Sequence, residues 1–156
     1  MLKVTVAYLV VIVYNAEVKR TDTRLPFKKG SILFAPMEGV TDGPYREVIQ
    51  RTFSDWDYFA TDFYRIPSVG RVGNNALIKH FGESYLAKKS HTEKTAFQFL
   101  TSEIAQTKQV IDLVNELNYH HIDLNLGCPS KKVNSNKGGA YLLSDILALE
   151  KIIKEK

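Results

Sequence analysis

Four short apolar runs alternate with helical patterns between residues 31 and 156, and this alternation limits the possible folds more than any other feature. Runs of four to six residues rich in aromatic and β-branched side chains predict buried strands, and apolar residues three or four apart predict helices. The expected strands are Ile32 to Ala35, Trp56 to Thr61, Thr95 to Leu100 and Ile122 to Leu126. Such alternation favours an α/β fold with a parallel sheet, here of (βα)4 type.

A helix is expected after each of these strands. The first begins at Asp42 or Gly43, which can cap it, with Pro44 in the first turn. This first helix is expected to end at about Phe53. The other three expected helices are Ala76 to Phe81, Glu103 to Leu117 and Leu142 to Lys156. The segment from Asp62 to Asn75 carries proline and glycine and predicts a long loop.

The size of this pattern corresponds to half of a known architecture. A complete (β/α)8 TIM barrel takes ~250 residues, and residues 31–156 make up about half of that length. We therefore expect a half-barrel at 31–156, preceded by an N-terminal extension and linker at 1–30. The uncharged run from Val4 to Tyr14 predicts a strand, because a span across a bilayer needs ~20 apolar residues. No membrane association is expected.

Charge and cysteine content exclude several classes of site. The net charge is +4, which permits a nucleic-acid partner without requiring one. Cys128 is the only cysteine in the chain. A single cysteine excludes an internal disulfide framework and a multi-cysteine metal site, and it is typical of a cytoplasmic protein. No metal site is predicted.

The stretch from His121 to Leu143 is the strongest candidate for a functional site. Its strand ends in Asn125, and Gly127-Cys128-Pro129 and two lysines follow before the pair Gly138-Gly139. Parallel α/β scaffolds commonly present side chains to a ligand at such a place. The residues alone leave other interpretations open. Cys128 can be a small buried hydrophobe and Asn125 a turn cap, while Lys131 and Lys132 can be solvated.

Four motifs in order resemble the tRNA-dihydrouridine synthases, and the resemblance extends from Ser31 to about Lys156. The motif NLGCPSKKV begins at Asn125 and is followed by Gly-Gly-Ala. The segment APMEGVTD, from Ala35, resembles the first barrel strand and its loop, and Gln98-Phe99-Leu100 resembles the third strand. Thr61-Asp62-Phe63 resembles the end of the second strand, where the family usually has Thr-Glu. APMEGV further suggests the bacterial subgroup that modifies position 16 of tRNA.

The resemblance implies an oxidoreductase that reduces uridine to 5,6-dihydrouridine in tRNA, with FMN as cofactor and NADPH as electron donor. Cys128 corresponds to the acid that protonates C5 of the uracil, and Asn125 to a residue beside the uracil or flavin edge. Pro36 and Met37 correspond to a loop against the flavin ring, and Gln98 to a residue that binds the isoalloxazine. On residue type alone, Met37 is expected to be an ordinary side chain of the hydrophobic core and Gln98 a buried polar side chain.

Further expectations concern charged residues near this site. Arg65, Lys131 and Lys132, with Arg71 and Lys137 as weaker candidates, can bind tRNA phosphates. Asp62 is one methylene shorter than the family's glutamate, so a contact of that glutamate can be lost. Asp123 alternates with Ile122 and Leu124, which predicts that it points away from their face and cannot replace Cys128 as an acid.

The missing half of the barrel leaves three hypotheses open. In the family the flavin phosphate and a lysine and histidine that bind FMN lie in the second half of the barrel. A half-barrel alone is expected to have two open sheet edges and an exposed apolar inner face. The chain can be the N-terminal half of a dihydrouridine synthase, or an inactive half-barrel that depends on association with another chain. The third hypothesis is another FMN-dependent pyrimidine-base oxidoreductase.

Overall fold

The computed structural model describes residues 10–14, 30–82, 89–117, 119 and 121–154. The strands are β1 (Val10–Tyr14), β2 (Leu33–Phe34), β3 (Tyr58–Ala60), β4 (Tyr64–Arg65), β5 (Thr95–Leu100) and β6 (His121–Asn125). The helices are α1 (Gly43–Thr52), α2 (Asn74–Phe81), α4 (Lys89–Glu93), α5 (Ile104–Glu116), α6 (Lys131–Ser135), the 3-10 helix η1 (Gly139–Ser144) and α7 (Ile146–Lys154).

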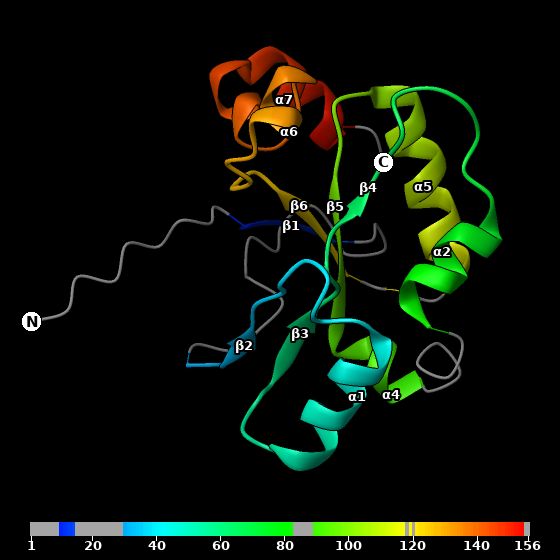
Figure 1. Cartoon of the computed structure of the whole chain (residues 1–156), viewed down its shortest axis with the longest axis vertical. Coiled ribbons are helices and arrows are strands. Elements are labelled where there is room, and N and C mark those ends of the chain that lie inside the picture. Colours follow the sequence, from blue (N-terminus) through cyan, green and yellow to red (C-terminus); the bar gives the residue numbers. More distant parts are fainter. Residues whose placement is uncertain (1–9, 15–29, 83–88, 118, 120, 155–156) are drawn as a thin grey trace, which may run out of the picture.

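The sheet confirms the predicted α/β half-barrel. Its strand order is β1-β6-β5-β3-β2, and the four strands β2, β3, β5 and β6 are mutually parallel. Helices follow each of these strands, as the alternation predicts (Figure 1). Asp42 caps α1 as expected, because its side chain accepts a hydrogen bond from the backbone N–H of Tyr45 and Pro44 lies in the first turn.

The expected loop and the expected last helix both differ from the sequence prediction, and the first two strands are shorter than expected. The segment expected as a loop contains β4, in which Tyr64 and Arg65 pair in parallel with Phe99 and Leu100 of β5. Two residues are too few to show the alternation that identifies a strand. The last helix is not continuous either: η1 ends at Ser144, and Asp145 caps α7 by accepting from the backbone N–H of Ala148. Asp favours caps over helix interiors, which explains the break.

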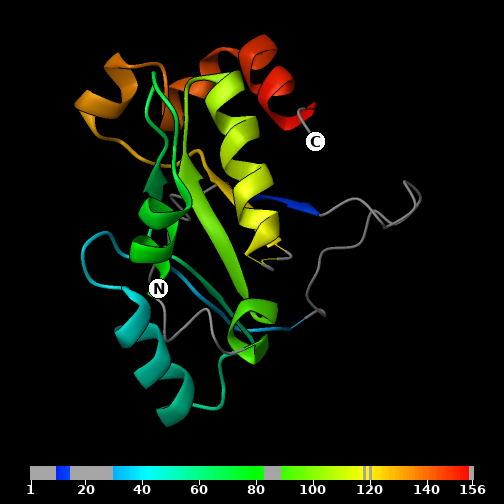
Figure 2. The same ribbon diagram turned by 90° about the vertical axis from the view of Figure 1, so that its right-hand side faces the viewer.

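The hydrophobic core lies between the sheet and the helices on one of its faces. Figures 1 and 2 both show α5 running alongside β5. Phe97, Phe99, Ile122 and Leu124 on this face pack with apolar side chains of α2, α5 and α7. Aromatic rings add to this packing, with Phe81 and Phe97 at a centroid distance of 5.0 Å. This face therefore fixes the strands whose carboxyl ends form the site.

The opposite face of the sheet is partly polar, which corrects the expected apolar inner face. Alternation along β5 and β6 directs Gln98 and Asp123 away from the helices, and the two residues are register partners. Both are almost fully buried, at 5% and 3% exposure. Buried polar side chains need partners, so this face has to contain a hydrogen-bonded arrangement.

β1 pairs with the outer edge of β6, although the rest of the sheet is parallel. Its register is antiparallel, from Val10 opposite Asn125 to Tyr14 opposite His121. The predicted strand is thus confirmed for residues 10–14, and residues 4–9 lie outside the described part of the chain. In a TIM barrel this edge pairs with the next parallel strand. The expectation that the β6 edge is open is wrong, because β1 pairs with it.

The described helices include none that is long and apolar enough to cross a membrane.

Candidate functional site

Three polar side chains of β5 and β6 form a continuous hydrogen-bonded chain, which we call the amide relay: Asp123, Gln98 and Asn125, the last residue of β6. Gln98 Nε2 donates to Asp123 Oδ2 at 2.6 Å. Asn125 Nδ2 donates to Gln98 Oε1 at 2.9 Å. Asn125 Oδ1 accepts from the backbone N–H groups of Gly127 at 3.0 Å and Cys128 at 3.1 Å. The relay thus connects a buried carboxyl group to the loop that carries the thiol.

Cys128 is half-buried and its thiol is free. The backbone hydrogen bonds from Gly127 and Cys128 to the Asn125 side chain form a turn of the Asx type. The interpretation of Asn125 as a turn cap is therefore confirmed, and the turn that it caps is the one that positions Cys128. The turn lies where β6 ends and the chain continues towards α6, η1 and α7, which lie together beyond the strand ends (Figure 1).

The glycine pair after α6 allows close packing against this turn. Gly139 has a φ of +60°, and a Cβ there would lie 2.9 Å from Val133 Cγ1 and 3.2 Å from Cys128 Cβ. A Cβ on Gly138 would lie 3.0 Å from the backbone oxygen of Thr101, which follows β5. Any side chain at these positions would push η1 away from Cys128 and from the end of β5.

Asp123 is the site residue that the sequence reasoning missed. The prediction that it points away from the face of Ile122 and Leu124 is geometrically correct, but the face to which it points is that of Gln98 and Asn125. Burial raises the pKa of the Asp123 carboxyl from 3.8 to about 6, and the hydrogen bond from Gln98 acts in the opposite direction. Its Oδ1 atom has no hydrogen-bond partner among the described residues. Its position two residues before Asn125 on the strand was the available signal.

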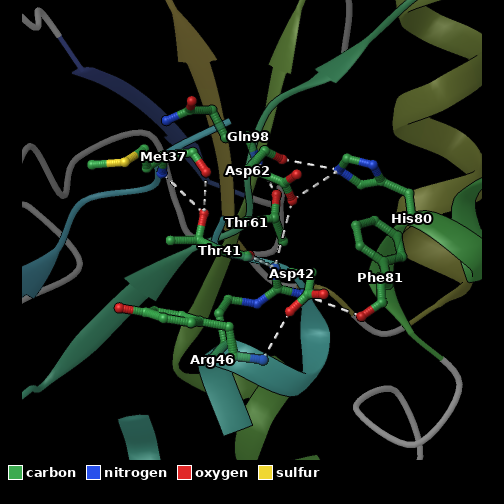
Figure 3. A network of polar contacts seen from close by, with 10 residues as sticks. Met37, Thr41, Asp42, Arg46, Thr61, Asp62, His80, Phe81 and Gln98 are labelled. Carbon is green, nitrogen blue, oxygen red and sulfur yellow. Dashed lines mark hydrogen bonds and ion pairs between the residues drawn. The ribbon is translucent and has the colours of Figure 1, made fainter. Parts of the chain in front are cut away.

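The loop after β2 holds Met37 in a tight turn. The backbone N–H of Met37 donates to Thr41 Oγ1 at 2.9 Å, and the Thr41 hydroxyl donates back to the Met37 carbonyl at 3.1 Å (Figure 3). Met37 is 63% exposed, so the interpretation as plain core is wrong. The turn directs the thioether outward, whereas Pro36 is half-buried.

A buried ionic network supports this loop from beneath. Arg46 of α1 is fully buried and donates to the carbonyl oxygens of Thr41 and, at 3.2 Å, of Phe81. Its guanidinium lies 3.7 Å from Asp62 Oδ1, and His80 Nε2 lies 3.6 Å from the same atom (Figure 3). Both distances exceed hydrogen-bond range. His80 also hydrogen-bonds the Asp62 carbonyl at 2.9 Å, so the network joins α1, α2 and the end of β3.

The basic residues proposed for tRNA lie at exposed positions. Arg65 is in β4, with its guanidinium 5.8 Å from the ring centroid of Phe63. Lys131 and Lys132 open the short helix α6, directly after the Cys128 turn. The structure therefore brings Cys128, Asn125 and Gln98 together through hydrogen bonds. It places Met37 and Pro36 in a separate loop, and the basic side chains in solvent.

A parallel α/β half-barrel with polar side chains and a thiol at its strand ends belongs to the TIM-barrel class, in which chemistry occurs at the carboxyl ends of the strands. Within this class, the chain belongs to the dihydrouridine synthase family: the model "Dihydrouridine synthase (Dus)" matches residues 33–156. The predicted family and fold class are thus confirmed.

Curated relatives agree with the family match. A "tRNA-dihydrouridine(16) synthase" of Vibrio vulnificus is 30% identical over 129 residues, covering 79% of this chain. A "tRNA-dihydrouridine(16) synthase" of Pseudomonas putida is 32% identical over 80% of this chain, and a "Probable tRNA-dihydrouridine synthase" of Aquifex aeolicus is 32% identical over 83%. The matched region spans 38% of the length of each of these relatives.

Proposed function

We propose that this chain supplies the N-terminal half of a flavin-dependent tRNA-dihydrouridine synthase, which reduces uridine to 5,6-dihydrouridine in tRNA. The observation that supports the proposal is the turn in which the backbone N–H of Cys128 donates to Asn125, whose amide in turn donates to Gln98. The names of the Vibrio and Pseudomonas relatives support uridine 16 as the target. The cytoplasm, where tRNA is modified, is the proposed location.

The residues present fit the ring portion of FMN. In the relay, Gln98 Nε2 and Asn125 Nδ2 each use one of their two amide hydrogens, so each retains a donor for a ring oxygen or nitrogen. Met37 and Pro36 offer an exposed thioether and a half-buried pyrrolidine against a flat ring. When bound, reduced FMN would supply the hydride for C6 of uracil, with NADPH as the electron source.

Cys128 would supply the second hydrogen of the reduction. Addition of a hydride at C6 requires a proton at C5, and the S–H group of Cys128 would donate it as a general acid. A uridine within a folded tRNA has to leave its stack to reach this turn, which costs a few kcal/mol. Arg65, Lys131 and Lys132 would contact phosphates, which contribute affinity but no sequence information.

A second half of the barrel is the proposed partner. The matched relatives are much longer than the matched region, and Leu143, Ile146 and Leu147 expose apolar side chains in η1 and α7. Apolar side chains gathered at such positions mark contact surfaces. For the isolated chain we propose self-association and no stoichiometric binding of FMN, because a barrel flavin usually binds its phosphate after strands 7 and 8.

Reconstitution tests the proposal. The purified chain is mixed with FMN, with and without a polypeptide containing the remaining part of the Aquifex relative, and flavin absorbance after gel filtration is measured. Dihydrouridine in unmodified tRNA is then quantified with NADPH present. We expect retained flavin and dihydrouridine only when both polypeptides are present, and loss of product with Arg65→Ala combined with Lys131→Ala.

Each alternative gives a different result. If the mixture retains flavin but forms no dihydrouridine, the inactive half-barrel is favoured. If free uracil is reduced and tRNA is not, the chain belongs with the pyrimidine-base oxidoreductases instead. One FMN per chain without the second polypeptide contradicts the proposed need for a partner.

A further inference from the structure

We propose that Asp123 is a positioning residue for Cys128: it fixes the orientation of the Gln98 and Asn125 amides, and through them the turn that carries the thiol. The role of the thiol in catalysis rests on the proposed function. The positioning itself concerns only contacts within this chain.

The argument begins with hydrogen-bond polarity. An ionised carboxylate only accepts, so the Gln98 group at 2.6 Å from Asp123 Oδ2 has to be the amide nitrogen. This directs Gln98 Oε1 towards Asn125, where it can accept only from Nδ2, at 2.9 Å. Asn125 Oδ1 is thereby left facing the backbone N–H groups of Gly127 and Cys128. The four hydrogen bonds thus share one polarity, with the Asp123 oxygen as the acceptor at the end of the relay.

The reverse arrangement fails at the turn. If the Gln98 amide were rotated by 180°, its nitrogen would face Asn125, which would then turn its own nitrogen towards the N–H groups of Gly127 and Cys128. Donors would face donors, and buried unpaired N–H groups are costly. The N–H groups of the turn and the Asp123 oxygen thus require the same polarity from the two ends of the relay, and loss of Asp123 leaves only the turn to hold the Gln98 amide.

The second oxygen of Asp123 would allow the relay to keep its polarity when the carboxyl is protonated. Oδ1 has no hydrogen-bond partner among the described residues, so a proton can be carried there. Oδ2 then remains an acceptor for Gln98. The element that matters for positioning is therefore the acceptor oxygen and not the negative charge. An asparagine, which keeps such an oxygen, is expected to retain the relay.

The test uses the fact that Cys128 is the only cysteine in the chain, so alkylation reports on one thiol without flavin or tRNA. Rates of reaction with iodoacetamide are measured for the full chain at pH 7.5 under folding conditions, confirmed by circular dichroism. Asp123→Ala is expected to react about fivefold faster than wild type, as loss of one hydrogen bond would permit. Gln98→Ala should match it, and Asp123→Asn should stay near the wild-type rate.

A matched control separates positioning from lost stability. Val114→Ala creates a cavity on the helix-covered face, away from the relay, and its free energy of unfolding is measured beside that of Asp123→Ala. The control is expected to be destabilised without faster alkylation. The proposal is overturned if Asp123→Ala is alkylated at the wild-type rate. It is also overturned if Asp123→Asn or Val114→Ala is alkylated as fast as Asp123→Ala. Failure of the reconstitution described above leaves this result unaffected, so the two can fail separately.

Discussion

Asp123→Asn should change how the stability of this chain depends on pH. Asp123 is 3% exposed, and the part of the chain that the structure describes offers no hydrogen-bond partner to its Oδ1, so burial disfavours the ionised carboxyl and raises its pKa from 3.8 to about 6. Asparagine has nearly the same shape, keeps the acceptor for Gln98 and does not ionise. The substitution therefore removes the cost of burying the charge while preserving the packing.

The sign follows from proton binding. Between about pH 4 and pH 6 the folded chain binds more protons at Asp123 than the unfolded chain does, so stability falls as the pH rises through this range. Well below pH 3.8 the carboxyl is protonated in both states and the effect vanishes. The effect is complete well above pH 6, where the carboxyl is ionised in both states. The shift from 3.8 to about 6 corresponds to roughly 3 kcal/mol of free energy of unfolding.

Urea denaturation at a series of pH values between 4 and 8 measures this effect. The difference in free energy of unfolding between Asp123→Asn and wild type should increase by roughly 2.5 kcal/mol in favour of the variant from pH 4 to pH 7, since the unfolded carboxyl is already about half ionised at pH 4. Other titrating groups contribute equally to both proteins and cancel. A difference that stays constant to within about 0.5 kcal/mol would show that Asp123 is solvated or compensated, and would refute the reasoning from burial.

Four further substitutions test other parts of the molecule. Cys128→Ala in the reconstituted enzyme should lower the rate of tRNA-driven flavin reoxidation by ~10²–10⁴-fold and leave flavin reduction by NADPH intact, and Cys128→Ser should behave more like alanine than wild type. Stopped-flow absorbance measures both steps. Reoxidation at the wild-type rate would show that Cys128 is not the acid. Gly139→Ala should lower the free energy of unfolding in urea by about 1–3 kcal/mol, because its Cβ would meet Val133 and Cys128. Gly73→Ala is the control, because its Cβ would meet no atom within 4 Å. Arg46→Met should lower the free energy of unfolding by about 3–5 kcal/mol, while Arg51→Met on the exposed side of α1 should lower it by at most about 0.5 kcal/mol. Equal effects of the two substitutions would contradict a structural role of the buried network. Ile12→Pro should disturb β1 pairing and increase self-association in sedimentation experiments, and an unchanged distribution would show that β1 does not protect the β6 edge.

Local sequence determined the elements whose signals lie within a few residues. The strand Thr95–Leu100 has its predicted bounds, because its composition and flanking residues suffice to define it. The start of α1 follows from the Asp42 cap and Pro44, and α5 from a repeated apolar face. The four ordered motifs likewise identified the family without coordinates.

The amide relay could be predicted only in part. Gln98, Asn125 and Cys128 were expected from the motifs, and alternation along β6 correctly directed Asp123 away from Ile122. Which face of the sheet the helices cover is not encoded in that alternation, since both faces of β6 are buried. The pairing of Gln98 with Asp123 depends on the register between two strands separated by a helix, and this register identifies Asp123 as part of the site.

Tertiary structure decided the remaining features, because each depends on groups far apart in the chain. Met37 is exposed because Thr41 closes a turn that α1 and Arg46 hold in place from beneath, not because of its own hydrophobicity. β4 forms because β5 offers it a pairing edge, and β1 forms because it pairs with the edge of β6. Local sequence contributes almost nothing to the stability of a two-residue strand or to the direction of a strand. Both are set by the partner edge with whose N–H and C=O groups the strand pairs.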